Sequence, residues 1–78
     1  MLTTSKLIEL GNLISDEMSK FNINKTSLYI TSNKEMFKKL DEDLFYRIND
    51  DKEKEYVPSE NEINLSFPYL NIIIKKED

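Results

Sequence analysis

The sequence predicts an α+β domain in which two helices pack on one face of a small, mostly antiparallel sheet of four or five strands. Three observations predict this fold class. Apolar residues recur at helical spacing over residues 4–21, a β-branched run follows at 26–31, and residues 62–75 alternate between apolar and polar side chains. The expected order of elements is α-β-α-β-β-β-β, and a chain of 78 residues has room for a single domain, residues 1–78.

The first helix is expected over residues 4–21. Thr3, Thr4 or Ser5 can cap its start, because a hydroxyl there accepts a hydrogen bond from a free backbone N–H. Gly11 costs about 1 kcal/mol relative to alanine inside a helix. Two interpretations stay open: a neighbouring element approaches closely at Gly11, or the helix simply tolerates it. The residues expected on the buried face are Leu7, Leu10, Leu13, Ile14, Met18 and Phe21.

A strand over residues 26–31 should lead into the second helix. Ser32 and Glu35 have capping-box spacing, in which each side chain satisfies a backbone donor near the other residue. The helix is expected to end within residues 41–43, because three acids near a helix C-terminus oppose its dipole. Its expected buried stripe consists of Met36, Phe37, Leu40 and, if the helix extends so far, Leu44.

Residues 44–48 allow two interpretations. They can continue the second helix, or they can form a strand with Leu44, Tyr46 and Ile48 on one face, and their β propensity favours the strand. The remaining segments are expected to form a polar loop over 49–54, a short edge strand over 55–57, a turn over 58–61 and two strands over 62–67 and 70–75.

The net charge is −4, and the acidic residues are concentrated in one stretch. Residues 41–62 hold nine acids and three bases, a net charge of −6, which leaves +2 for the rest of the chain. This balance disfavours direct binding to nucleic acid, where contacts between basic residues and phosphates supply most of the affinity. The acids form a candidate partner surface made of Asp41, Glu42, Asp43, Asp50, Asp51, Glu53 and Glu55.

The composition suggests a source and an alternative function. Ten of the eleven basic residues are lysine, and isoleucine and asparagine are plentiful, which is typical of a low-GC bacterium, its phages or its mobile elements. Small phage-encoded inhibitors of host nucleases and defence systems imitate DNA phosphates with acidic side chains. The chain resembles these inhibitors in size, acidity and composition, and no sequence motif carries the resemblance. It implies, as an alternative, a nucleic-acid mimic that occupies a basic groove.

The sequence lacks the residues from which most catalytic centres are built. It contains no cysteine and no histidine, and its only glycine, Gly11, cannot make a glycine-rich phosphate loop. We therefore expect a protein that is not an enzyme and has no cofactor and no metal, and we assign no catalytic or ligating residue. The least favoured alternative is a metal-dependent hydrolase built on Asp41, Asp43, Asp50 and Asp51.

The apolar run near the C-terminus suggests a surface for assembly. The candidate residues of an uncovered sheet edge, through which a homodimer or a structural subunit assembles, are Leu70, Ile72, Ile73 and Ile74. The longest apolar run, residues 72–74, is too short to cross a membrane and no signal-like segment is seen, so a cytoplasmic protein is expected. The sequence thus predicts a small, acidic, non-enzymatic accessory protein, phage- or mobile-element-related, that acts through contact with a protein partner.

Overall fold

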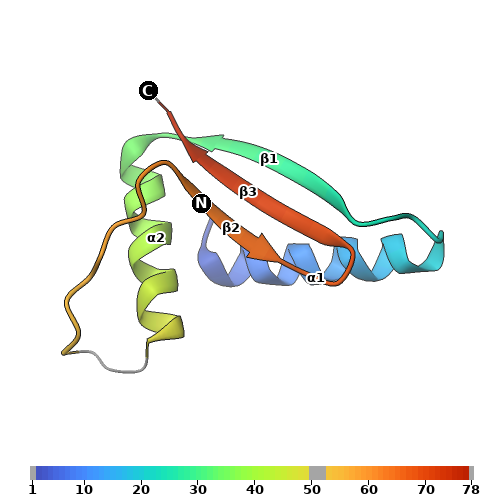
Figure 1. Ribbon diagram of the computed structural model, residues 1–78, viewed down its shortest axis with the longest axis horizontal. Coiled ribbons are helices and arrows are strands. Elements are labelled where there is room, and N and C mark those ends of the chain that lie inside the picture. The colour runs from blue at the N-terminus through green and yellow to red at the C-terminus, as the bar shows by residue number, and fades with distance from the viewer. Residues whose placement is uncertain (1, 50–52, 78) are drawn as a thin grey trace.

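The structure is a computed structural model that describes residues 2–49 and 53–77. Within these residues it has two helices, α1 (Thr4–Lys20) and α2 (Lys34–Ile48), and three strands, β1 (Thr26–Ser32), β2 (Glu62–Ser66) and β3 (Leu70–Lys76). The α+β class is therefore confirmed, whereas the prediction of four or five strands is wrong. Figure 1 shows α1 running along the sheet and α2 standing across one end of it.

α1 forms where the helical spacing predicts it. The Thr3 hydroxyl caps its start by accepting a hydrogen bond from the Lys6 N–H at 3.2 Å. The helix ends at Lys20, and Asn22 then adopts a φ of 54°. This left-handed conformation ends a helix, and asparagine tolerates it better than most residues.

The sheet is mixed, with β3 in the middle. β1 pairs with β3 in parallel and β2 pairs with it antiparallel, in the strand order β1-β3-β2. β2 and β3 form the hairpin that their alternation predicts. The expectation of a mostly antiparallel sheet is wrong for β1, because the chain passes through α2 and a loop before it returns beside that strand, and such crossovers join parallel strands.

α2 begins one residue later than the capping-box spacing predicts. Asn33 caps its start, and the side-chain oxygen of Asn33 accepts a hydrogen bond from the Met36 N–H at 2.8 Å. Ser32 instead donates its hydroxyl to the carbonyl of Asn33 at 3.1 Å. Glu35 forms an ion pair with Lys39 at 3.5 Å, so the predicted reciprocal cap is wrong although the helix itself is confirmed.

α2 also continues through residues 44–48, so the strand predicted there is wrong. Leu44 is buried in the core, where tertiary packing outweighs local β propensity. Arg47 forms an ion pair with Asp43 at 2.9 Å, and this spacing of four residues supports a helix. The helix ends at Ile48.

Residues 53–61, the described residues that lead into β2, add no strand to the sheet. The edge strand predicted over residues 55–57 is absent from the described part of this segment, residues 53–61, because Tyr56 turns its hydroxyl toward α2. Residues 50–52, which belong to the predicted polar loop, lie outside the described residues.

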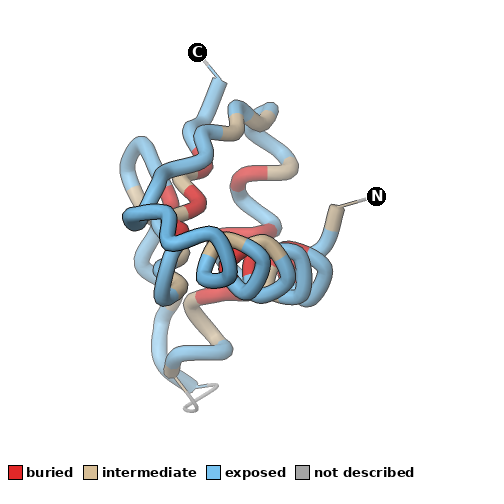
Figure 2. Tube along the Cα trace, turned by 90° about the vertical axis from the view of Figure 1, so that its right-hand side faces the viewer, coloured by how far each residue is buried: buried red, intermediate tan, exposed pale blue. Residues whose placement is uncertain are grey.

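The hydrophobic core lies between the helices and one face of the sheet (Figure 2). Its buried members are Leu7, Phe37, Leu40, Leu44, Ile63, Leu70, Ile72 and Ile74. This confirms the predicted inward alternation of the last two strands. On the other face of the sheet Tyr29, Ile73 and Asn64 lie in register across the three strands.

Candidate functional site

The buried face of α1 differs from the apolar stripe that its sequence predicts. The residues that this helix buries are Thr4, Leu7, Gly11 and Ser15. Three large side chains expected in the core, those of Leu10, Leu13 and Phe21, are 43%, 58% and 70% exposed. The helix therefore buries small residues together with Leu7 and leaves Leu10 and Leu13 exposed.

Two contacts with the β2–β3 turn explain this orientation. The ring of Phe67 occupies the space beside Gly11, and any Cβ atom at Gly11 would collide with it. One turn further along, the Ser15 hydroxyl accepts a hydrogen bond from the Tyr69 N–H at 2.9 Å, which satisfies a buried polar group. The interpretation of Gly11 as a point of close approach is confirmed.

Large apolar residues are exposed in several places, among them Ile48 and Val57 at the α2 end, and five lie on α1, on β1 and on the segment that joins them. We call these five the α1–β1 surface, and they are Leu10, Leu13, Phe21, Ile23 and Leu28. Leu28 faces the helix layer yet is 38% exposed, so the helices leave that part of β1 uncovered. A groove of about 350 Å³ lies beside α1, lined by Leu13, Ile14, Glu17, Met18, Phe21 and Ile23. Apolar surface gathered in this way usually marks an interface.

β1 is an edge of the sheet, and no described strand pairs with its outer side. The Thr26 N–H donates to the Tyr69 carbonyl at 3.1 Å, at the β3 side of the strand. The Ser32 carbonyl, on the same side, accepts from the Glu77 N–H at 2.8 Å. Because backbone groups alternate along a strand, the N–H and C=O groups that point outward are those of Ser27, Tyr29 and Thr31. The strand has neither proline nor charge, the usual protections of an edge.

The predicted assembly edge therefore lies on a different strand. The residues proposed for it, Leu70, Ile72, Ile73 and Ile74, belong to β3. β3 is paired on both sides within the chain, so the prediction that it forms a sheet edge is wrong. A run that is apolar on both faces suits a central strand.

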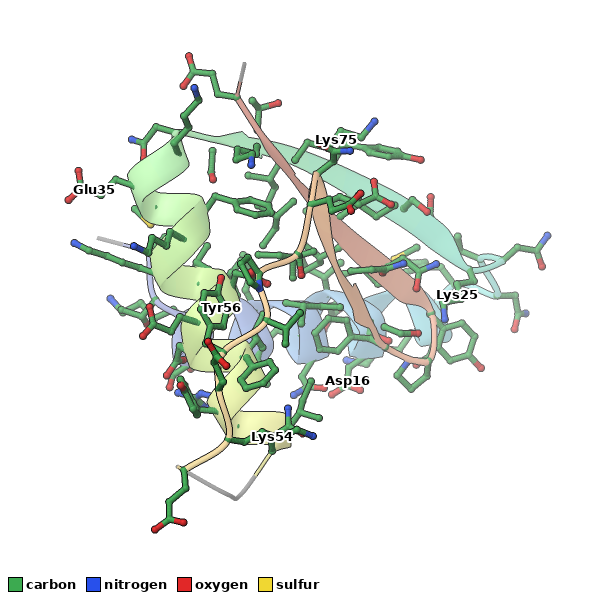
Figure 3. The ribbon with its side chains drawn as sticks, turned by 60° about the vertical axis from the view of Figure 1, so that its left-hand side comes forward. Asp16, Lys25, Glu35, Lys54, Tyr56 and Lys75 are labelled. Carbon is green, nitrogen blue, oxygen red and sulfur yellow. The ribbon has the colours of Figure 1, made fainter. Side chains whose placement is uncertain are left out.

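Asp41 lies at the α2 end of the molecule, in a polar site where its hydrogen-bond partners come from residues of the same chain. Its side chain is 6% exposed although it carries a charge. It accepts hydrogen bonds from the Tyr56 hydroxyl at 2.5 Å, the Ser59 N–H at 2.8 Å and the Ser59 hydroxyl at 2.7 Å. Figure 3 shows Tyr56 lying against α2. These bonds fasten residues 56–59 to the helix.

The protonation states at this site follow from its hydrogen bonds. Burial alone would raise the pKa of Asp41, but hydrogen bonds from Tyr56 and Ser59, with the charge of Lys76, outweigh burial and lower that pKa below 3.8. Burial, together with the hydrogen bond to Asp41 and the charges of Asp41 and Glu42, raises the pKa of Tyr56 to about 12. Near neutral pH neither group is poised to exchange a proton.

The other acids of the candidate partner surface do not gather around Asp41. A hydrogen bond from Thr4 is the main cause that lowers the pKa of Asp43; burial opposes it, and the hydrogen bond and charge of Arg47 add to it. Arg47 also donates to the Ser5 hydroxyl at 2.7 Å and so joins the two helices. The exposed acids of the set are Glu42, Asp43, Glu53 and Glu55, whereas Asp50 and Asp51 lie outside the described residues.

A pocket of about 270 Å³ opens beside Asp41. The charged residues of its lining besides Asp41 are Lys34, Lys38 and Lys76. Both oxygens of Asp41 already accept hydrogen bonds from the loop, so the pocket offers no free carboxylate for acid–base work. Across residues 2–49 and 53–77, no group of three or more histidine, cysteine, aspartate or glutamate residues is placed to hold a metal ion.

The feature that sequence reasoning missed is the α1–β1 surface. Helical spacing places Leu10, Leu13 and Phe21 in the core, because it cannot tell which flank of a helix meets the sheet. The available signal was the alignment of Gly11 and Ser15, four residues apart, which marks a side of the helix made of small residues.

No known protein family matches the chain, and no match is found among curated proteins or solved structures. Neither α1 nor α2, the helices of the described residues, is long and apolar enough to cross a membrane. The placement of the chain's own residues therefore carries the functional proposal.

Proposed function

We propose that the protein is a small, non-enzymatic accessory protein that acts through protein–protein contact at the α1–β1 surface. The observation that carries the proposal is the apolar stripe of α1 that the fold leaves uncovered. Leu13 and Phe21 are mostly exposed, while the smaller Gly11 and Ser15 of the same helix are buried. A domain of this size depends on each apolar side chain that it buries, so large exposed ones favour a partner that covers them.

The polar end of the molecule supports the non-enzymatic part of the proposal. The buried carboxylate of Asp41 is fully used in holding the loop to α2. The Tyr56 hydroxyl, with a pKa raised to about 12, stays protonated near neutral pH. Asp41, the one buried acid among the residues that the structure describes, thus has a structural role.

The nucleic-acid-mimic alternative stays a prediction, as does the phage or mobile-element origin. Asp41 is buried and Asp43 is held by Thr4 and Arg47, so these two acids are engaged within the chain. A mimic would have to rely on the remaining acids of residues 41–62. The structure favours the apolar surface over the acidic stretch as the place of contact.

Site-specific photo-crosslinking in the source cell tests the proposal. A photoreactive amino acid at Leu10, which is 43% exposed on the α1–β1 surface, should give a discrete adduct heavier than the chain. Asn12 is the matched control, because it is exposed and residues two apart point to nearly opposite sides of a helix. Equal adducts from both positions, or none from Leu10, would contradict the proposal.

A further inference from the structure

We propose that β1 pairs with β1 of a second copy, antiparallel about a two-fold axis at Tyr29, so that two three-stranded sheets join into one. The inference rests on the proposed function in that it names a second copy of this chain as a partner at the α1–β1 surface. Its own basis is the edge of β1, whose outer backbone groups have no strand beside them in the described chain.

The sequence of β1 gives the same order of side-chain types whether it is read from its N-terminus or from its C-terminus. The strand reads Thr-Ser-Leu-Tyr-Ile-Thr-Ser, with Tyr29 at its centre. With Tyr29 opposite the partner's Tyr29, the remaining pairs are Leu28 with the partner's Ile30, Ser27 with the partner's Thr31, and Thr26 with the partner's Ser32. Hydroxyl residues thus meet hydroxyl residues and aliphatic residues meet aliphatic ones. A two-fold interface requires such self-complementarity, which an unrelated strand has no reason to provide.

The backbone of β1 fits the same register. Its outward N–H and C=O groups belong to Ser27, Tyr29 and Thr31, which are placed symmetrically about Tyr29. Antiparallel residues that face each other through outward groups exchange two hydrogen bonds per pair, so three such pairs supply about six. If the register shifted by one residue, the outward N–H and C=O groups of one copy would face residues of the other copy whose groups point inward. Each side chain would then also lie opposite one on the wrong face of the sheet.

The two faces of the joined sheet would also match. A two-fold axis perpendicular to the sheet keeps both helix layers on one side. Leu28, which faces that layer and is 38% exposed, would then pack beside the partner's Ile30. The α1–β1 surfaces of both copies would lie on this same side, so pairing reduces the exposure that singles them out.

Charge does not oppose the contact, although each chain carries −4. β1 has no charged residue. Residues 1–40 hold six lysines and four acids, a net charge of +2, and the acidic surplus lies in residues 41–62. Figure 1 shows the second half of α2, which carries part of that surplus, at the end of the molecule away from the start of β1.

Light scattering on the full chain, from micromolar to millimolar concentration, tests the pairing. The expected mass of the unmodified protein is twice the 9.3 kDa of one chain. Tyr29→Lys and Tyr29→Glu each place like charges opposite each other on the axis, so each variant should be a monomer, and an equal mixture should recover the dimer. Tyr29 is 63% exposed, so neither variant loses core packing, and Tyr29→Phe is the control that should stay dimeric.

Amide exchange tests the register. The N–H groups of Ser27, Tyr29 and Thr31 should gain protection as the protein concentration rises, whereas that of Leu28, already directed to β3, should not change. A chain that stays monomeric at millimolar concentration, or a dimeric Tyr29→Lys variant, overturns the inference. If the dimer fails while Leu10 still crosslinks to another protein, the proposed function stands. If the dimer forms and Leu10 gives no adduct, the part of the proposed function that places contact on α1 fails, while the pairing of β1 stands.

Discussion

The two ends of the molecule differ in how they accommodate groups that destabilise a fold, which are a buried charge at one end and exposed apolar side chains with unpaired strand backbone at the other. At the α2 end a charged carboxylate is buried, and it is bonded so fully that no buried side-chain polar atom of the described residues lacks a partner. At the α1–β1 end, large apolar side chains and a row of strand backbone groups face solvent. A buried charge is tolerated only when it is paired, so the Asp41 site is complete within one chain, although Ile48 and Val57 at the same end are exposed. The second end is where we expect a partner.

At the α2 end, removing the Asp41 carboxylate should have the largest effect on the free energy of unfolding. Asp41→Ala leaves the hydroxyls of Tyr56 and Ser59 and the Ser59 N–H without their acceptor. We expect the free energy of unfolding to fall by roughly 3 kcal/mol, as is usual when a buried network around a charge is broken. Urea denaturation followed by circular dichroism measures this change.

Glu42→Ala is the matched control for that substitution. Glu42 is the next residue of α2 and is exposed, so its loss should change the free energy of unfolding by less than about 0.5 kcal/mol. Equal effects of the two substitutions would contradict the difference drawn between the two ends, because they would show that the Asp41 hydrogen bonds do not stabilise the fold.

Adding a side chain at Gly11, where the Phe67 ring packs, should have the next largest effect on the free energy of unfolding. Alanine gains about 1 kcal/mol in helix propensity. Its methyl group, however, would collide with the Phe67 ring, and overpacking costs about 1–3 kcal/mol. We expect Gly11→Ala to lower the free energy of unfolding by about 1 kcal/mol, as the balance of these two effects.

A double-mutant cycle separates the two contributions at Gly11. In a Phe67→Ala background the ring is absent, so Gly11→Ala should raise the free energy of unfolding by about 1 kcal/mol. A stabilising effect of Gly11→Ala in the unmodified chain would show that Phe67 does not fix the orientation of α1.

Local patterns predict the helices and the C-terminal hairpin, and long-range contacts decide what those patterns miss. Residues 44–48 have strand propensity, yet Leu44 completes the core and Arg47 reaches back to Asp43, so the segment stays helical. The predicted strand over residues 55–57 is lost because the Tyr56 hydroxyl bonds to a carboxylate fifteen residues earlier. The burial of Leu44 and the bond between Tyr56 and Asp41 have no signature within a short window of sequence, whereas the four-residue spacing of Asp43 and Arg47 does.

The candidate site follows the same rule. Apolar spacing identifies the residues of the α1 stripe correctly, but their exposure depends on Phe67, which docks on Gly11 from more than fifty residues away. The alternation of β1 predicts a strand without predicting its neighbours, so the edge was assigned to β3. The acidic stretch predicts charge, and in the structure Asp41 is buried in a hydrogen-bond network while the exposed Asp43 pairs with Arg47.

Low pH should lower the free energy of unfolding, and part of this loss should depend on the Asp41 carboxylate. Its pKa in the folded chain lies below the ordinary value of 3.8, so the carboxylate stabilises the fold above that pH and loses this contribution as the pH falls through the lowered pKa. The difference in unfolding free energy between the unmodified chain and Asp41→Asn should therefore be constant above about pH 5 and shrink below about pH 4. A difference that stays constant down to about pH 2 would contradict this assignment.

The smallest effect on stability should come from the α1–β1 end. Leu13→Ala and Leu7→Ala make the same chemical change on one helix, but Leu13 is 58% exposed and Leu7 is completely buried. We expect Leu7→Ala to cost about 2–5 kcal/mol in urea denaturation at low protein concentration, and Leu13→Ala less than about 0.5 kcal/mol. A cost at Leu13 similar to that at Leu7 would mean that this side chain already serves the core. A negligible cost would mean that the fold of one chain does not need the Leu13 side chain, which supports contact with a partner as its role.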